Sequence, residues 1–332
     1  MKKVCFLPLI LSLILTISCQ NIEHKQVNAT PKDVSNVLVI GLDDAAQNMD
    51  VMCFVSYIEK ENSVSFVQIP RDTYFDFGGS QNKINQIYSF YKANLSPKQA
   101  MSKAKDDIVN AMGVAVDGYI AITTKGLIQG IDALGGIEID MSDSAVFTDE
   151  YGENPLSLHK GNNHLNGNSC VQFLRYRKGY LTGDLGRLDA QKLFFKGMMN
   201  KFSNGLSVDR LLHAFLMVQD DIMTDLNVVD LVRMSSTGLD SLANAKINYL
   251  TLPGEAAIST RGLSYYVLNK KSTSEVCRKY LFSKREIFDA EGKFFCESEI
   301  SFKNIYNDQN KDYRVYDNDT LNGIHIPKKQ KT

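Results

Sequence analysis

The chain has 332 residues, long enough for one large domain or two small ones with a full hydrophobic core. Its 37 lysine and arginine residues nearly balance 38 aspartate and glutamate residues, and charge is spread along the whole chain. This balance argues against a protein that binds nucleic acid or a membrane surface through bulk electrostatics. Any anion-binding site must therefore be local.

The first residues predict export. Lys2 and Lys3 precede an apolar run over residues 4–18, which is shorter than the roughly 20 residues of a membrane-spanning helix and typical of a secretory signal. Cys19 ends this run as the lipidated cysteine does in bacterial lipoprotein signals, although Thr16 stands where such signals usually have leucine. An uncleaved N-terminal anchor is the alternative, and both place the rest of the chain outside the cytoplasmic membrane. Residues 1–19 are thus predicted as an export or lipoprotein-type signal and residues 20–35 as a linker.

The remaining cysteines match no zinc-binding spacing. Cys53 and Cys170 lie in apolar runs and are predicted to be core residues. Cys277 and Cys296 are candidates for a disulfide in an oxidising compartment.

Three predicted strands come first, at residues 36–43, 50–59 and 63–70. Charged residues stand where these strands begin or end, namely Asp43, Asp44, Asp50, Arg71 and Asp72. In an open α/β sheet, the loops at one edge are where ligands bind. A hairpin between the second and third strands favours Asp50 next to Arg71.

The following segments alternate between helix and strand. Helices are predicted at 83–94, 96–112 and 124–134, with strands at 117–123 and 137–141. This alternation predicts an α/β fold in which helices cover both faces of a mixed central sheet. Lys83, at the start of the first helix, would meet a phosphate together with backbone N–H groups, and a capped surface lysine is the alternative.

Residues 170–191 concentrate cationic side chains. A helix is predicted at 166–176, after a loop at 161–167. This helix must end there for Arg175 and Arg177 to point the same way, because residues two apart do not share a helical face. Asp184 suits the N-cap of the next helix, with Arg187 and Gln191 on one face of it. Guanidinium groups bind phosphate oxygens bidentately, so these residues predict the floor of a pyrophosphate site. A solvated turn is the alternative.

Three more helices are predicted at 208–218, 228–242 and 272–282, with a strand at 247–252. Polarity rises and periodicity fades after residue 282. Residues 283–332 are therefore predicted as a peripheral C-terminal tail.

Seven short motifs in order resemble the LytR-CpsA-Psr family over about residues 36–282. They are GLD at 41–43, IPRD at 69–72, KIN at 83–85, DALGG at 132–136, LNG at 165–167, RYR at 175–177 and GDLGR at 183–187.

The resemblance implies an extracytoplasmic, Mg²⁺-dependent phosphotransferase. Such enzymes move a glycopolymer from a polyprenyl pyrophosphate carrier onto peptidoglycan at the outer face of the cytoplasmic membrane, and their α-β-α sandwich holds the lipid in a hydrophobic tunnel. Carried over motif by motif, the metal ligands would be Asp43 and Asp50. The pyrophosphate-binding residues would be Arg71, Lys83, Arg175, Arg177, Arg187 and Gln191. The catalytic residues would be Arg71, Asp72, Arg175, Arg177 and Asp184, with either Asp72 or Asp184 orienting the sugar hydroxyl or an arginine.

Two departures from the family pattern suggest an alternative. Asn48 and Ala190 stand where the family usually has arginine, and each missing charge-assisted contact is worth about 1.5–3 kcal/mol. The alternative function is a non-catalytic binder of polyprenyl-phosphate-linked cell-envelope intermediates. Transcriptional regulation is disfavoured, because the exported chain has neither a helix-turn-helix signal nor a basic excess, and no nucleic-acid partner is expected.

Overall fold

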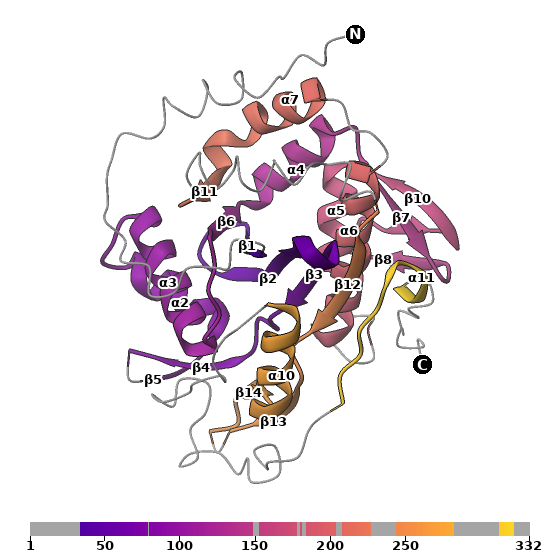
Figure 1. Cartoon of the computed structure of the whole chain (residues 1–332). Helices are drawn as coiled ribbons and strands as arrows, with labels where there is room; N and C mark the ends of the chain where they lie inside the picture. The colour runs from indigo at the N-terminus through magenta and orange to yellow at the C-terminus, as the bar shows by residue number, and fades with distance from the viewer. Residues whose placement is uncertain are drawn as a thin grey trace.

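The computed structural model describes residues 34–78, 80–148, 153–177, 180, 184–203, 208–226, 244–259, 261–281 and 312–321 (Figure 1). The predicted signal, nearly all of the predicted linker and the helix predicted at 228–242 lie outside these residues. Within them, no helix combines the length and the apolar character needed to cross a membrane.

A six-stranded mixed sheet forms the centre of the fold. Its order is β11 (Ile222–Thr224), β6 (Gly118–Ile122), β1 (Val34–Leu42), β2 (Met49–Ile58), β3 (Ser63–Gln68) and β12 (Lys246–Thr251). β1 runs parallel to β6 and β3 runs parallel to β12, whereas the other neighbours are antiparallel. The predicted mixed sheet is confirmed.

Side chains alternate between the two faces of this sheet and form two hydrophobic clusters. On β2, Phe54 belongs to the first cluster and Cys53 to the second. The first cluster includes residues of α2 (Ile87–Lys92), α3 (Pro97–Met112) and α10 (Lys270–Tyr280). The second includes residues of α4 (Thr124–Ala133), α5 (Gly167–Arg175) and α6 (Asp184–Ser203). Figure 1 shows α2 and α3 on one side of the sheet and α5 and α6 on the other, so helices cover both faces as predicted.

Close packing of α5 on α4 depends on the DALGG motif at 132–136 and the LNG motif at 165–167. The Gly167 backbone N–H donates to Asp132 Oδ1 at 2.7 Å, which joins the first turn of α5 to the end of α4. A Cβ atom at Gly167 would lie 2.3 Å from the carbonyl oxygen of Ile128, so only glycine allows this approach. α7 (Val208–Val218) packs on α4 in turn.

Two short strands were not predicted. The helix predicted at 83–94 is present as the 3₁₀ turn Ile84–Gln86, whose N-cap is Lys83, followed directly by α2. Lys83 also ends the unpredicted strand β5 (Ser80–Lys83), which pairs with β4 (Tyr74–Phe77). The loop predicted at 161–167 contains β10 (Gly161–Leu165), which pairs with β7 (Ile137–Met141). β5 and β10 are short and polar, which leaves little periodicity to detect.

Two further hairpins have no predicted counterpart. β8 (Ala145–Phe147) pairs with β9 (Leu156–Leu158), and β13 (Gly254–Ile258) pairs with β14 (Ser264–Leu268). β14 lies beside the site, because the Tyr266 backbone N–H donates to the carbonyl oxygen of Asp72 at 2.8 Å.

Part of the predicted tail is docked on the domain. Tyr316 exchanges two backbone hydrogen bonds with Tyr249 on β12, at 2.8 and 3.0 Å. α11 (Asn318–Leu321) follows, and Leu321 is fully buried in the second cluster. From α6, Lys196 Nζ donates to the carbonyl oxygen of Asn318 at 2.7 Å.

The cysteine predictions are confirmed where the structure describes them. Cys53 and Cys170 are fully buried in the second cluster. Cys277 is a buried free thiol in the first cluster, and Cys296, the partner considered for it, lies outside the described residues.

Candidate functional site

The turn between β1 and β2 holds the first predicted metal ligand. Asp43 accepts hydrogen bonds from the Gln47 backbone N–H at 2.8 Å and from Asn48 Nδ2 at 2.7 Å. Lys92 Nζ, from α2, donates to the carbonyl oxygen of Ala46 at 2.9 Å. Asn48, which replaces an expected arginine, therefore organises this turn around the carboxylate of Asp43.

Asp50 lies next to Arg71, as the hairpin predicts. β2 and β3 are antiparallel, so the start of β2 lies beside the chain that leaves β3, and the Ile69 backbone N–H donates to the Met52 carbonyl oxygen. Arg71 Nη1 is 2.5 Å from Asp50 Oδ1. The pair stands at one end of the central sheet, where charged groups were expected.

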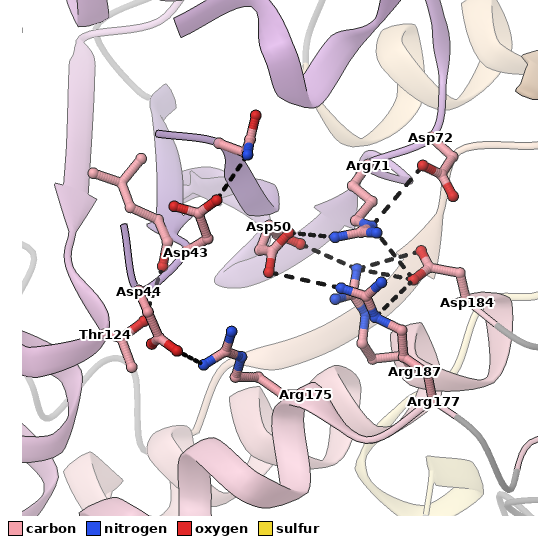
Figure 2. Close-up of polar contacts among 12 residues, drawn as sticks. Asp43, Asp44, Asp50, Arg71, Asp72, Thr124, Arg175, Arg177, Asp184 and Arg187 are labelled. Atoms are coloured by element: carbon pink, nitrogen blue, oxygen red, sulfur yellow. Dashed lines mark hydrogen bonds and ion pairs between the residues drawn. The ribbon is translucent and has the colours of Figure 1, made fainter. Parts of the chain in front are cut away.

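Arg177 and Arg187 approach the same carboxylates from the other side. α5 ends at Arg175 and the chain extends at Tyr176, which has ψ 133°. Arg187 Nη2, on α6, is 3.2 Å from Asp184 Oδ1 and 3.3 Å from the Asp50 carbonyl oxygen. Asp184 Oδ1 also faces Arg71 Nε at 3.5 Å and Arg177 Nε at 3.7 Å. We call Arg71, Arg177 and Arg187, with Asp50 and Asp184, the arginine cluster (Figure 2).

Arg175 stands apart from this cluster. It forms an ion pair with Asp44, whose carboxylate also bonds to Thr124, and Figure 2 shows this group separated from the other arginines. The hydrogen bond from Arg175 lowers the pKa of Asp44 below its usual value. The predicted convergence of the arginines in 170–191 therefore holds for Arg177 and Arg187, whereas Arg175 contacts a different carboxylate.

Lys83 and Asp72 flank the arginine cluster. Lys83 Nζ is 2.9 Å from Asp72 Oδ1, and Asp72 Oδ1 is 3.9 Å from Arg71 Nε. Lys83 reaches this position from the end of β5, where it is also the N-cap of the 3₁₀ turn Ile84–Gln86.

Several buried donors at the site have no hydrogen-bond partner within the described part of the chain. Arg71 Nε, Arg187 Nε and Gln191 Nε2 are buried without a hydrogen-bond partner among the described residues. Such atoms are rare in native proteins, because an unmet buried donor costs free energy. The Arg187 side chain is 1% exposed, and burial lowers its pKa although Asp184 opposes that effect. Three unmet donors in one place are what a site for an anionic ligand requires.

A cleft of about 430 Å³, counted out to open solvent, adjoins these groups. Its polar lining includes Asp50, Arg175, Arg187 and Gln191. Its apolar lining consists of Leu42, Val51, Ile122, Leu127, Val171 and Leu174. The cleft therefore places anion-binding side chains beside an apolar wall, while a tunnel for a whole lipid chain stays a prediction.

The aspartates of the site could hold a metal ion only if a bound substrate supplied further oxygen ligands. Among the described residues, no group of three or more histidine, cysteine, aspartate or glutamate side chains is placed to hold a metal. Mg²⁺ commonly binds one or two carboxylates and completes its shell with waters and substrate phosphates. Asp43, held by neutral donors, and Asp50, across from Arg71, fit that kind of site.

Two further positions differ from expectation. Ala190, where an arginine was expected, is fully buried in the second cluster. Gln68, which has no predicted role, donates from Nε2 to Gln191 Oε1 at 3.2 Å. Its signal in the sequence is a single polar residue at the end of an apolar strand.

Comparison with known proteins identifies the family of the chain. The LytR_cpsA_psr family model matches residues 16–280. The polyisoprenyl-teichoic acid–peptidoglycan teichoic acid transferase TagU of Bacillus subtilis (strain 168) is 27% identical over 260 residues, covering 77% of this chain and 79% of TagU. Its homologue in Oceanobacillus iheyensis is 26% identical over 260 residues, covering 76% of this chain and 78% of the relative.

Solved structures agree at the level of the fold. The crystal structure of B. subtilis TagU has a TM-score of 0.55 and 26% identity, covering 76% of this chain and 97% of that one. Protein gbs0355 from Streptococcus agalactiae has a TM-score of 0.64 and 22% identity, covering 76% of this chain and 90% of that one. The chain therefore belongs to the LytR-CpsA-Psr family.

Proposed function

We propose that this protein is an extracytoplasmic phosphotransferase that moves a glycopolymer from a polyprenyl pyrophosphate carrier onto peptidoglycan. The observation that carries the proposal is the set of unmet buried donors beside a partly apolar cleft. The TagU relatives are named as transferases of teichoic acid from a polyisoprenyl carrier to peptidoglycan, which supports the proposal. An outer-face location, with the N-terminus as lipid-modified or uncleaved anchor, belongs to the same proposal.

The arginine cluster would bind the pyrophosphate. Arg71 and Arg187 each have an Nε–H free to donate, and Arg177 lies beside them, so phosphate oxygens would replace weak contacts at 3.5 to 3.9 Å. Guanidinium groups placed before the reaction stabilise the charge that develops on phosphoryl oxygens, which is the main task in phosphoryl transfer. Arg175 would join by exchanging Asp44 for a phosphate oxygen.

The two aspartates left open by the sequence differ in their surroundings. Asp184 faces all three guanidiniums of the cluster, so we assign it the role of orienting them. Asp72 contacts Lys83 at 2.9 Å and keeps about a quarter of its side chain exposed (27%). Asp72 is therefore our candidate for orienting the incoming sugar hydroxyl.

Asp43 and Asp50 would hold the Mg²⁺ ion. When bound, the ion would supply positive charge to the phosphoryl oxygens and to the polyprenyl monophosphate that leaves, while the other phosphate stays with the transferred sugar. Asp50 would then share its carboxylate between the ion and Arg71, which ties the cation to the cluster.

A reconstituted reaction tests the proposal. The full-length chain would be incubated with a polyprenyl pyrophosphate-linked saccharide, a peptidoglycan oligomer and Mg²⁺ or EDTA, and mass spectrometry would follow the products. We expect a phosphodiester-linked sugar on peptidoglycan, abolished by Asp50→Asn and by EDTA. The control Arg278→Met changes an exposed arginine on α10 and should leave turnover unchanged.

The outcomes separate the candidate functions. Bound carrier that is never turned over, across several saccharides and divalent metals, would favour the non-catalytic binder suggested by Asn48 and Ala190. Release of a sugar phosphate without transfer would indicate that water replaces the sugar hydroxyl.

A further inference from the structure

Gln191 lines the cleft, and its amide oxygen is hydrogen-bonded to Gln68 at the end of β3. Its side chain is nearly fully buried, Oε1 accepts a hydrogen bond from Gln68, and Nε2 has no partner among the described residues. An amide is symmetric in shape but not in chemistry, since the nitrogen donates and the oxygen accepts. Only one of its two orientations offers a donor to an anion.

The orientation of the Gln191 amide depends on Gln68, whose own orientation is fixed by a backbone carbonyl group. The Leu188 carbonyl oxygen, on α6, can only accept, and it receives a hydrogen bond from Gln68 Nε2 at 3.1 Å. The same nitrogen has a second hydrogen, which it donates to Gln191 Oε1 at 3.2 Å. Turning the Gln68 amide over would place its oxygen against the carbonyl oxygen, which is unfavourable. Gln68 therefore faces Gln191 with a donor.

The far side of Gln68 is also held. Its Oε1 accepts a hydrogen bond from Thr251 Oγ1 at 3.0 Å, and residue Gln68 is only 1% exposed to solvent. Gln68 ends β3, Thr251 ends β12 and Leu188 lies on α6, so three elements hold one amide. A fully bonded buried amide has one orientation, because any other would leave buried groups unmet.

We propose that Gln68 is a positioning residue that turns the amide of Gln191 so that its Nε2 donates to the pyrophosphate. This inference rests on the function proposed above and adds a residue that the sequence motifs do not include. Gln68 does not line the cleft, so its effect must pass through Gln191. Removing Gln68 frees the Gln191 amide to turn and to present its oxygen to the anion, which repels it.

A double-mutant cycle on ligand binding tests this coupling. Calorimetric titration with geranyl pyrophosphate and Mg²⁺ would compare the full-length wild type with Gln68→Met, Gln191→Met and the double variant. Methionine keeps the volume and removes the amide. We expect each single variant to bind roughly 10-fold or more weakly, as for loss of one hydrogen bond to a charged group. The double variant should bind no more weakly than Gln191→Met alone.

Two more variants keep the result decisive. Gln68→Glu preserves the shape but offers acceptors to Gln191, so it should weaken binding as much as Gln68→Met does. Gln99→Met, at the start of α3, changes an exposed glutamine that does not line the cleft and should leave affinity unchanged. Thermal unfolding of every variant shows whether the fold is kept. If Gln68→Met does not fold, the cycle is run with Gln68→Glu.

Contrary results are distinguishable. If the wild type binds and Gln191→Met weakens binding, but Gln68 variants bind normally or their effects multiply with that of Gln191→Met, the positioning role is wrong and the proposed function stands. If the wild type does not bind geranyl pyrophosphate at all, the proposed function itself fails.

Discussion

Replacing Arg187 with methionine is expected to weaken anion binding without destabilising the fold. Burial lowers the pKa of Arg187, which means that the folded state is penalised for holding the guanidinium charged at neutral pH. Methionine fills a similar volume without a charge. Asp184 is not left unpaired, since Arg71 and Arg177 remain at 3.5 and 3.7 Å.

The two expected magnitudes have opposite signs. Replacing a whole buried ion pair by apolar residues is commonly neutral or stabilising by about 1–4 kcal/mol, and we expect Arg187→Met to resemble that case because Asp184 keeps two other guanidiniums. Loss of a charge-assisted contact to pyrophosphate costs about 1.5–3 kcal/mol, or roughly 10- to 150-fold in affinity. Stability should therefore stay level or rise while affinity falls, as expected where a site is built at the expense of stability.

Urea unfolding and calorimetric titration with pyrophosphate and Mg²⁺ measure the two effects. Lys192→Met is the matched control, because Lys192 is buried on the same helix, lies 2.7 Å from Asp189 and contacts the ring of Tyr316. It should lose stability and keep its affinity. The reasoning would be refuted if Arg187→Met lost about 2 kcal/mol or more of unfolding free energy and bound pyrophosphate like the wild type.

Two further predictions concern stability. Gly167→Ala should lower the free energy of unfolding by about 1–3 kcal/mol or more in urea, because its Cβ would lie 2.3 Å from the Ile128 carbonyl oxygen. Gly130→Ala, whose nearest neighbour would be at 3.4 Å, should raise it by about 0.4–1 kcal/mol, and equal losses in both would contradict the close helix approach. Asp44→Asn should lower the melting temperature at pH 6 but not near pH 2. The hydrogen bond from Arg175 lowers the folded-state pKa of Asp44 from 3.8. The stability that this ion pair contributes is therefore present above about pH 4 and is lost as the pH falls through the folded-state pKa. A pH-independent difference would show that the pair is not its source.

Local sequence features predicted much of the site. The short turn between β2 and β3 fixes the pairing of these strands, so the neighbourhood of Asp50 and Arg71 follows from the chain between them. The end of α5 at Arg175 was expected, because Arg175 and Arg177 can point the same way only if the helix ends between them. Asp184, the predicted N-cap, is the first described residue of α6. These features are settled within about twenty residues of chain.

Contacts between distant segments were not predictable in the same way. Arg175 pairs with Asp44, 131 residues away, and that contact depends on how α5 lies against the sheet. The orientation of Gln68 depends on groups from β12 and α6 together. The helical start at Lys83 was predicted, whereas the strand β5 that ends there was not, because that strand is short and polar. Residue types thus indicate which groups a phosphate site needs, whereas tertiary packing decides which carboxylate each cation meets.

The pairing of Tyr316 with Tyr249 has a practical consequence for work with fragments. β12 is the last strand of the central sheet, so without Tyr316 the backbone N–H and C=O groups of Tyr249 would lose their partners and lie at an unpaired part of that edge among the described residues. Open edges of this kind recruit strands from other molecules. A fragment cut where the family match ends, near residue 280, would expose the edge and also remove Leu321 from the core. Such a fragment should self-associate as its concentration rises, and material prepared for crystallography or kinetics should extend through residue 321.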